Sequence, residues 1–436
     1  MSKTIIIIGA GLAGLSAALQ AAENGCNVKL VSSLPSERAQ SVMAEGGINA
    51  ALNTKDENDS PEEHFTDTIK AACGLADQNA VWGMTQAAPE LVHWLLKLGV
   101  KFNMSGYDDV DLRNFGGQKK KRTAFAQSDT GKQIMTAMID AVRRKEASGM
   151  VERFSHHSFL TLRLCGNICC GCVIRDEYSQ ETVELPGDAV IVATGGMHGL
   201  FGNTTGSLSN TGEVTAELFR LGVPLANGEM IQYHPTTVKC GGKRMLISEA
   251  ARGEGGRLFA MKDGKQWYFM EEKYPELGNL MPRDITAREI WKVSHESEVF
   301  LDMTEISEEI ISNKLSGLVD DCMTYLHKDI RKEPVSVLPG IHYFMGGILV
   351  DEQHRTPIQN LCAAGECCAQ YHGANRLGGN SLLGALYGGR VAAKSACEQA
   401  DVVDLSCATQ IDFPPASQIS EIKQLNKVMQ ETMGAV

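Results

Sequence analysis

The first 32 residues contain the pattern that most restricts how this chain can fold. Thr4–Ile8 is a continuous run of β-branched residues, as expected of a strand that is buried on both faces. A glycine-rich turn follows at 9–14, residues 15–22 predict a helix, and Asn27–Ser32 predicts a second strand. A glycine-rich turn between the strand and the helix of a βαβ unit is typical of dinucleotide binding. We therefore predict an α/β fold that begins with a Rossmann-like domain.

The three glycines of this GxGxxG turn have separate physical roles. Gly9 permits the tight turn, Gly11 lets the backbone approach a pyrophosphate, and Gly14 allows the helix to pack closely on the strand. The second strand ends at Ser32, where an acidic residue usually contacts the ribose. A serine hydroxyl can still reach a ribose, but this departure argues against a simple NAD site.

Further glycine clusters favour FAD over NAD. The segment 44–47 follows the first unit, 189–196 is a buried strand that ends in a glycine pair, and 361–366 repeats the strand-to-glycine pattern. Pieces of one cofactor domain thus recur at both ends of the chain, which requires another domain to be inserted between them. Such a split domain is familiar among FAD-dependent oxidoreductases.

The charge balance and the cysteines narrow the class of protein further. The chain has 41 Lys and Arg against 53 Asp and Glu, and a net charge of -12 disfavours nucleic acid as a partner. No apolar stretch is long enough to span a membrane and no signal peptide is visible, so we expect a cytoplasmic protein without direct membrane insertion. The 13 cysteines lack a disulfide framework. Four of them lie in a predicted hairpin around 166–167, where we expect buried strand residues rather than a metal or redox site.

Several long motifs resemble the flavoprotein subunits of fumarate reductase and succinate dehydrogenase, in order and over nearly the whole chain. These motifs are 44–47, Phe115-Gly116-Gly117, 232–236, Glu249 with 252–256, Pro282-Arg283-Asp284, His342-Tyr343 with Gly346-Gly347, and 372–381.

The resemblance implies a split, Rossmann-like FAD-binding domain with an inserted α+β capping domain. We expect the FAD domain at 1–229 and 346–405, with the capping domain at 230–345. Residues 406–436 would form a tail that starts a helical C-terminal domain, which is otherwise largely absent. Residues 420–433 look like its first helix.

The family reaction is the reduction of fumarate to succinate or its reverse, with hydride from flavin N5. By resemblance, Arg283 donates the proton, and Glu249 and Arg252 deliver protons to it. Glu249 and Arg252 are three residues apart, which puts them on one face of a helix. The catalytic residues would therefore be Arg283, Glu249 and Arg252.

A C4-dicarboxylate substrate carries two negative charges, so local cations must offset the negative charge of the whole protein. The resemblance implies that His234, His342 and Arg376 hold its carboxylates, with Ser248 assisting. Arginine suits this role because it binds a carboxylate through two parallel hydrogen bonds. Phe115 and Gly47 complete the expected substrate-binding set.

The resemblance also implies the set of residues around FAD. Ser381 and Leu382 would open a helix that points at the flavin and favours negative charge there. The expected FAD contacts are Gly9, Gly11, Gly14, Ser32, Ala44, Gly46, Gly47, Ala193, Thr194, Gly195, Glu366, Arg376, Ser381 and Leu382.

Two departures from the family pattern affect the expected function. Many members link FAD covalently to a histidine five residues before the glutamate of the 44–47 segment, where this chain has Gln40. We therefore expect non-covalent FAD, which favours fumarate reduction. The short C-terminus puts docking in a respiratory complex in doubt. We still expect an electron donor, either an iron–sulfur subunit or another one, and partner subunits would place the chain at the inner face of the membrane.

Three alternatives remain open from the sequence. L-aspartate oxidase also lacks the covalent link, but it carries a glutamate for the substrate ammonium where this chain has Phe115. The substrate can also be another unsaturated carboxylate. A non-catalytic flavoprotein is a third class, and it has no reason to keep Arg283, Glu249 and Arg252 together.

Overall fold

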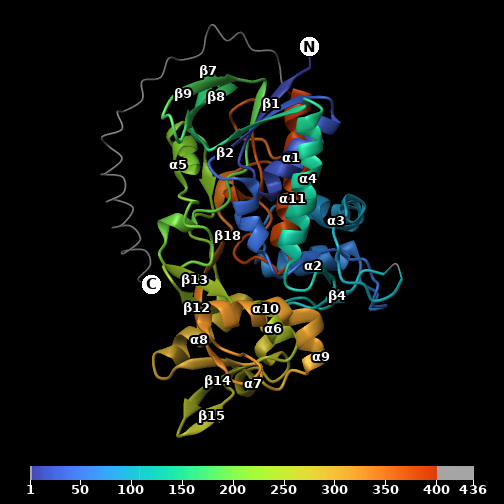
Figure 1. Ribbon diagram of the computed structural model, residues 1–436, viewed down its shortest axis with the longest axis vertical. Coiled ribbons are helices and arrows are strands. Elements are labelled where there is room, and N and C mark those ends of the chain that lie inside the picture. Colours follow the sequence, from blue (N-terminus) through green and yellow to red (C-terminus); the bar gives the residue numbers. More distant parts are fainter. Residues whose placement is uncertain (1, 108, 400–436) are drawn as a thin grey trace.

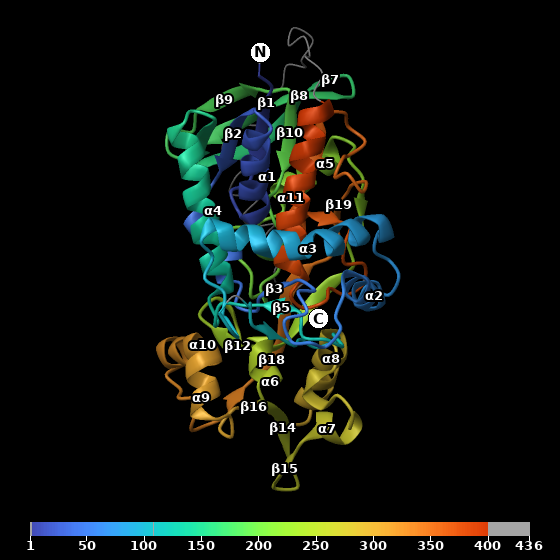
Figure 2. The same ribbon diagram turned by 90° about the vertical axis from the view of Figure 1, so that its right-hand side faces the viewer.

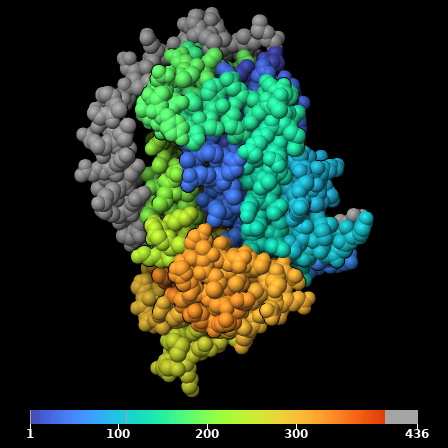
Figure 3. All heavy atoms as spheres, in the orientation of Figure 1, coloured from blue at the N-terminus to red at the C-terminus, as the bar shows by residue number. Residues whose placement is uncertain are grey.

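The computed structural model describes residues 2–107 and 109–399. Figure 1 shows two regions stacked along the long axis, with a parallel sheet and long helices above and the capping segments below. Figure 3 shows the lower region as a separate mass in yellow and orange. The predicted tail at 406–436, including the helix expected at 420–433, lies outside the described residues. Within the described residues, no helix has the length and apolar character needed to span a bilayer.

The upper region is built on a five-stranded parallel sheet. Its strand order is β20-β10-β1-β2-β6, with β1 in the centre. The predicted strands at the start of the chain and in the 189–196 and 361–366 segments are confirmed. The sheet contains β1 (Thr4–Ile8), β2 (Asn27–Ser32), β6 (Val151–Ser155), β10 (Ala189–Val192) and β20 (Leu361–Ala363).

Successive isoleucines of β1 point to opposite faces of this sheet, as alternation in a strand requires. Ile5 and Ile7 pack with α1 (Leu12–Glu23), α4 (Thr130–Ala147) and α11 (Asn380–Gln399). Figure 2 shows these three helices side by side on one face. On the other face, Ile6 and Ile8 pack with the antiparallel sheet β7-β8-β9. Both faces are therefore covered, which explains why the four buried residues Ile5–Ile8 are all apolar.

The helix after β1 begins earlier than the pattern predicts. It starts at Leu12 rather than at residue 15, because Gly11 is its N-cap. The predicted hairpin is confirmed: β7 (His157–Cys165) and β8 (Ile168–Asp176) flank the turn at 166–167. β9 (Thr182–Pro186) is the third strand of that sheet.

The lower region contains two antiparallel sheets. The sheet β13-β12-β18 lies at the junction with the upper region (Figure 1), and β15-β14-β16-β17 lies farther away. The strands are β12 (Ile231–Cys240), β13 (Lys243–Leu246), β14 (Arg257–Lys262), β15 (Lys265–Trp267), β16 (Val299–Asp302), β17 (Val335–Ser336) and β18 (Leu338–Phe344). The helices are α6 (Glu249–Gly253), α7 (Phe269–Lys273), α8 (Arg283–Ser294), α9 (Glu308–Ile310) and α10 (Ser316–Asp321).

Other elements connect these parts. Strands β3, β5 and β4 form a small sheet, as do β11, β19 and β21. Their bounds are β3 (Ile48–Asn49), β4 (Leu112–Arg113), β5 (Thr123–Ala124), β11 (Leu225–Ala226), β19 (Gly347–Leu349) and β21 (Cys368–Ala369). The remaining long helices are α2 (Pro61–Ala71), α3 (Gln78–Leu98) and α5 (Glu213–Arg220).

We propose domain boundaries at 229/230 and 345/346. Supporting this, the apolar core of the lower region is formed by residues between 238 and 337, joined by Phe115. The two cores of the upper region contain no residue from that range. Phe115 thus packs with the lower region although it precedes that region by more than a hundred positions.

Candidate active site

A cavity of about 900 Å³ runs along the carboxyl ends of β1 and β10 to the junction between the two regions. This is the expected position of a ligand in an open parallel sheet. Nearly all the predicted contacts line it. The predicted residues on its wall are Gly9, Gly11, Ser32, Ala44, Gly46, Gly47, Phe115, Ala193, Thr194, Gly195, His234, Ser248, Glu249, Arg283, His342, Glu366, Arg376, Ser381 and Leu382. Gly14 and Arg252 are not on the wall and lie behind it.

The glycine turn after β1 is held by close backbone contacts. Gly9 has φ +112°, and a Cβ there would lie 2.2 Å from the carbonyl oxygen of Ala193. A Cβ on Gly14 would lie 1.8 Å from the carbonyl oxygen of Gly9. Neither position tolerates a side chain. Gly11 has its backbone on the cavity wall at the N-terminus of α1, where a phosphate is stabilised.

Unpaired polar atoms on the wall fit a polar cofactor. Among the described residues, the buried atoms Ser32 Oγ, Glu45 Oε2 and Arg376 Nε have no hydrogen-bond partner. All three residues line the cavity. A buried polar group without a partner is costly, so these atoms are suited to a bound ligand such as FAD.

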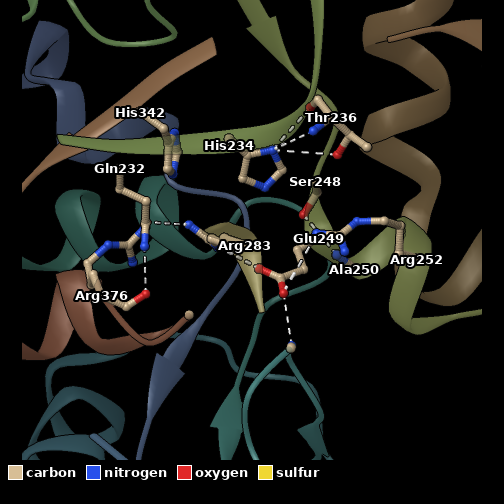
Figure 4. A network of polar contacts seen from close by, with 12 residues as sticks. Gln232, His234, Thr236, Ser248, Glu249, Ala250, Arg252, Arg283, His342 and Arg376 are labelled. Carbon is tan, nitrogen blue, oxygen red and sulfur yellow. Dashed lines mark hydrogen bonds and ion pairs between the residues drawn. The ribbon is translucent and has the colours of Figure 1, made fainter. Parts of the chain in front are cut away.

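The core of the site is a buried ion pair between Glu249 and Arg283 (Figure 4). Arg283 is the first residue of α8, and its Nε and Nη2 each lie 2.7 Å from Glu249 Oε2. Glu249 Oε1 accepts a hydrogen bond of 2.8 Å from the backbone N–H of Gly116. Burial alone would raise the pKa of Glu249, but Arg283 and Arg252 outweigh it, so the pKa lies below its ordinary value. Glu249 is therefore held as a carboxylate.

Arg252 lies on the far side of the same carboxylate. Its Nη2 is 3.8 Å from Glu249 Oε1, and its Nη1 donates to the carbonyl oxygen of Asn279 at 2.6 Å. Ser248 is the N-cap of α6, so the helix start sets the direction of both Glu249 and Arg252. As the three-residue spacing predicts, the helix brings these two side chains together.

Gln232 connects Arg283 and Arg376 on the cavity wall, and sequence reasoning missed its role. Its Oε1 accepts from Arg283 Nη1 at 3.1 Å and from Arg376 Nη2 at 3.0 Å. Its Nε2 donates to the carbonyl oxygen of Arg376 at 2.7 Å. The residue lies in the 232–236 motif, so the sequence marks its position. Its two partners become evident only in the fold.

Arg376 is a buried cation whose polar partner is neutral. Its guanidinium lies over the Tyr343 ring, 4.5 Å from the centroid. Burial and, to a smaller extent, the nearby Arg283 together lower the pKa of Arg376 to about 9. A negative ligand would relieve both effects.

Two histidines stand beside these arginines. The rings of His234 and His342 are 5.1 Å apart, on β12 and β18. His342 Nδ1 is 2.8 Å from Thr205 Oγ1, another contact without a sequence signal. Burial is the main cause that lowers the pKa of each histidine well below its ordinary value, and Arg283 lowers both further. Both are neutral near pH 7 and can donate one hydrogen bond each.

Phe115 closes one side of the cavity. It is 3% exposed, and its ring lies against two glycines: a Cβ on Gly46 would be 3.0 Å from Cζ, and one on Gly378 would be 2.9 Å from Cδ2. The described residues contain no group of His, Cys, Asp or Glu that could hold a metal ion.

Known proteins are similar to this chain in sequence and in fold. Residues 4–382 match the FAD_binding_2 family, an FAD binding domain. The chain is 44% identical to the succinate dehydrogenase flavoprotein subunit of Bacillus subtilis, over 93% of this chain and 70% of that one. It is 34% identical to the L-aspartate oxidase of Streptomyces coelicolor, over 90% of this chain and 68% of that one. A solved structure of a mutated FrdA from Escherichia coli quinol fumarate reductase has a TM-score of 0.88 and 29% identity, covering 100% of this chain and 78% of that one.

Proposed function

Because the chain belongs to the family of FAD-dependent oxidoreductases that includes the succinate dehydrogenase and fumarate reductase flavoproteins, we propose that it interconverts fumarate and succinate. The observation that carries this proposal is the charge of the site. Arg252, Arg283 and Arg376 are buried together, and Glu249 is the carboxylate in contact with two of them. Within this buried cluster, three guanidinium groups and one carboxylate leave two positive charges, which matches a dicarboxylate dianion.

Arg376, His234 and His342 would bind the substrate carboxylates. Arg376 can form two parallel hydrogen bonds with a carboxylate, and its Nε has no partner among the described residues. The histidines, neutral in the protein, add donors without adding repulsion to the arginines. Ser248 and the backbone of Gly47 line the same cavity and complete the contact surface.

Arg283 is suited to transfer the proton that fumarate needs. Reduction of fumarate takes up two electrons and two protons, and bound FAD supplies the two-electron chemistry. We assign one proton to the Arg283 guanidinium, which lines the cavity. Glu249 forms a hydrogen bond with Arg283 and would return a proton to it. Arg252, whose Nη2 lies 3.8 Å from Glu249 Oε1, would supply that proton to Glu249. An arginine is a very weak acid, so the immediate return of its proton is essential.

FAD would be held without a covalent bond. Gln40 lines the cavity where many family members have the linking histidine, and an amide nitrogen is not a nucleophile. After precipitation with acid, we expect the yellow colour in the supernatant. A pellet that stays yellow after washing would contradict this proposal.

The electron donor would be an iron–sulfur subunit or another reductant. Supporting this, one solved relative is the FrdA of a quinol fumarate reductase. Partner subunits would then set the location of the chain at the inner face of the membrane.

The test of function supplies a reduced viologen dye and compares fumarate, mono-carboxylate enoates and L-aspartate. We expect dye oxidation with fumarate and the appearance of succinate in the NMR spectrum. L-aspartate oxidase is the second candidate because of the 34% identity. The buried ring of Phe115 argues against it, because an apolar group cannot pair with the substrate ammonium. Peroxide formation from L-aspartate, with no succinate formed from fumarate, would favour L-aspartate oxidase over fumarate reduction.

A further inference from the structure

A second, smaller cavity of about 400 Å³ lies beside the first, where the β12–β13 hairpin meets the loop at Gly202 and Asn203. Lys239, Lys243 and Arg244 contribute its cations. Lys243 and Arg244 also line the large cavity, so the two cavities share a wall. In Figure 1 this hairpin lies at the junction between the upper and lower regions.

The three cations of this cavity have no carboxylate partner among residues 2–107 and 109–399. Arg244 is only 8% exposed, and its hydrogen bonds go to neutral oxygens. Nη2 donates to the carbonyl oxygens of Thr237 at 2.8 Å and Leu338 at 3.3 Å, and Nε donates to Thr237 Oγ1. A buried charge without a counter-charge is costly, so an anion in this cavity is favoured.

The loop that contains Thr204 and Thr205 connects Arg244 to His342 of the active site. The backbone N–H of Arg244 donates to the carbonyl oxygen of Thr204 at 2.9 Å. The next residue, Thr205, holds His342 Nδ1 through its hydroxyl. An anion at the smaller cavity is therefore one residue of backbone away from a group that faces the large cavity.

We propose that the smaller cavity is an outer binding site for small dicarboxylates, which receives the substrate before it enters the large cavity. The proposal rests on the proposed function for the identity of the dianion. Its physical basis is steering: a protein of net charge -12 repels the substrate at long range. Three uncompensated cations at the junction reverse that field within about a Debye length of 10 Å at 0.1 M salt.

The first test measures binding directly on the FAD-loaded protein. Lysines are acetylated with a limiting reagent, with and without succinate, and modification is read by peptide mass spectrometry. Lys262 and Lys265 are the matched controls, because they face each other across the β14–β15 turn of the same region. At succinate equal to about three times its dissociation constant, mass action slows acetylation of Lys239 and Lys243 about fourfold. Equal rates for all four lysines would overturn the proposal.

Acetate at the same ionic strength separates a specific site from general screening. Protection by succinate and not by acetate supports a dicarboxylate site. Equal protection by both at matched ionic strength overturns it. Protection of the lysines from acetylation does not depend on turnover, so this result tests the outer site separately from the proposed function.

The second test compares two double variants. Lys239→Glu with Lys243→Glu reverses the charge at the cavity, and Lys262→Glu with Lys265→Glu makes the same change on the control hairpin. We expect kcat/KM for fumarate to fall roughly tenfold in the first variant at low salt, and about twofold at high salt, because screening removes steering. The control should stay within about twofold of wild type. Equal losses in both variants, or a loss that salt does not change, would contradict the outer site.

Discussion

Two glutamates with enclosed carboxyl groups line the same cavity, and their pKa values are shifted in opposite directions. Glu249, in the lower region, touches Arg283 and lies near Arg252, and its pKa is held below the ordinary value. Glu45, in the upper region, is half-buried as a residue, but its Oε2 is enclosed and has no partner among the described residues. Burial and, to a smaller extent, the neighbouring Asp321 raise the pKa of Glu45 to about 8, against the opposing effect of Arg113.

The difference shows that charged partners, not burial alone, decide which group is ionised at this site. Glu249 is a carboxylate that can exchange a proton with a guanidinium, whereas Glu45 is a neutral acid at pH 7. Arg376 is the third case, a buried cation that contacts only neutral groups. Substitutions of the paired and the unpaired groups should therefore have different effects on activity and stability.

The largest effect is expected from breaking the paired charges. Arg283→Ala removes the proposed proton donor, and general-acid catalysis contributes roughly 10²–10⁴-fold. We expect fumarate turnover to fall by about 10³-fold in a dye-linked assay. The flavin spectrum of the purified variant should be unchanged. Turnover near the wild-type rate would remove Arg283 from the proton path.

A smaller effect is expected at the unpaired cation. Arg376→Met removes one carboxylate anchor, so the KM for fumarate should rise about 100-fold, as expected for a bidentate charged pair. Thermal stability of the protein without substrate should be unchanged or higher, because no buried carboxylate loses a partner. A clear fall in the melting temperature would show that Arg376 has a structural counter-charge.

Glu249→Gln should instead lower stability. The change leaves Arg283 and Arg252 buried without their carboxylate, and breaking a buried pair costs about 3–5 kcal/mol. Urea unfolding at pH 7 measures the free energy of unfolding. Glu45→Gln is the matched control, since it removes a group that is neutral in the folded protein, and it should leave stability at pH 7 unchanged or higher. Equal losses in the two variants would contradict the comparison.

The effect expected at Glu45 itself is a change of slope with pH. Glu45 has a folded pKa of about 8 and an ordinary value of 4.5, so the folded state binds the extra proton between these values. Its contribution to stability is therefore present at low pH and is lost as the pH rises to about 8. Glu45→Gln should flatten the fall in unfolding free energy between pH 5 and 8. An unchanged slope would mean that Glu45 is ionised in the folded protein.

The sequence predicts those parts of the fold that depend on local patterns. β1 and β2 have the predicted limits because β1 is a run of β-branched residues that ends at Gly9, and β2 begins just after the turn at 24–25. The sequence pattern places the start of α1 three residues too late, because Gly11, an N-cap without a side chain, gives no capping signal. Helix spacing also predicts that Glu249 and Arg252 share a face, as they do.

The hydrogen bonds that position the side chains of the site cannot be predicted from the sequence. Gln232 joins Arg283 to Arg376, and these partners come from α8 and from the loop before α11. Thr205 holds His342 across 137 positions. Such hydrogen bonds depend on tertiary placement, so a motif can mark the residue but not its partner.

The most direct test of the central claim is a single turnover without oxygen. The FAD-loaded protein is reduced with one equivalent of dithionite, mixed with fumarate in a stopped-flow instrument, and followed at the visible flavin band. We predict full reoxidation with one succinate per flavin for the wild type, and a flavin that stays reduced and bound in Arg283→Ala. A wild-type flavin that stays reduced in fumarate, or an Arg283→Ala protein that reoxidises at the wild-type rate, would contradict the account.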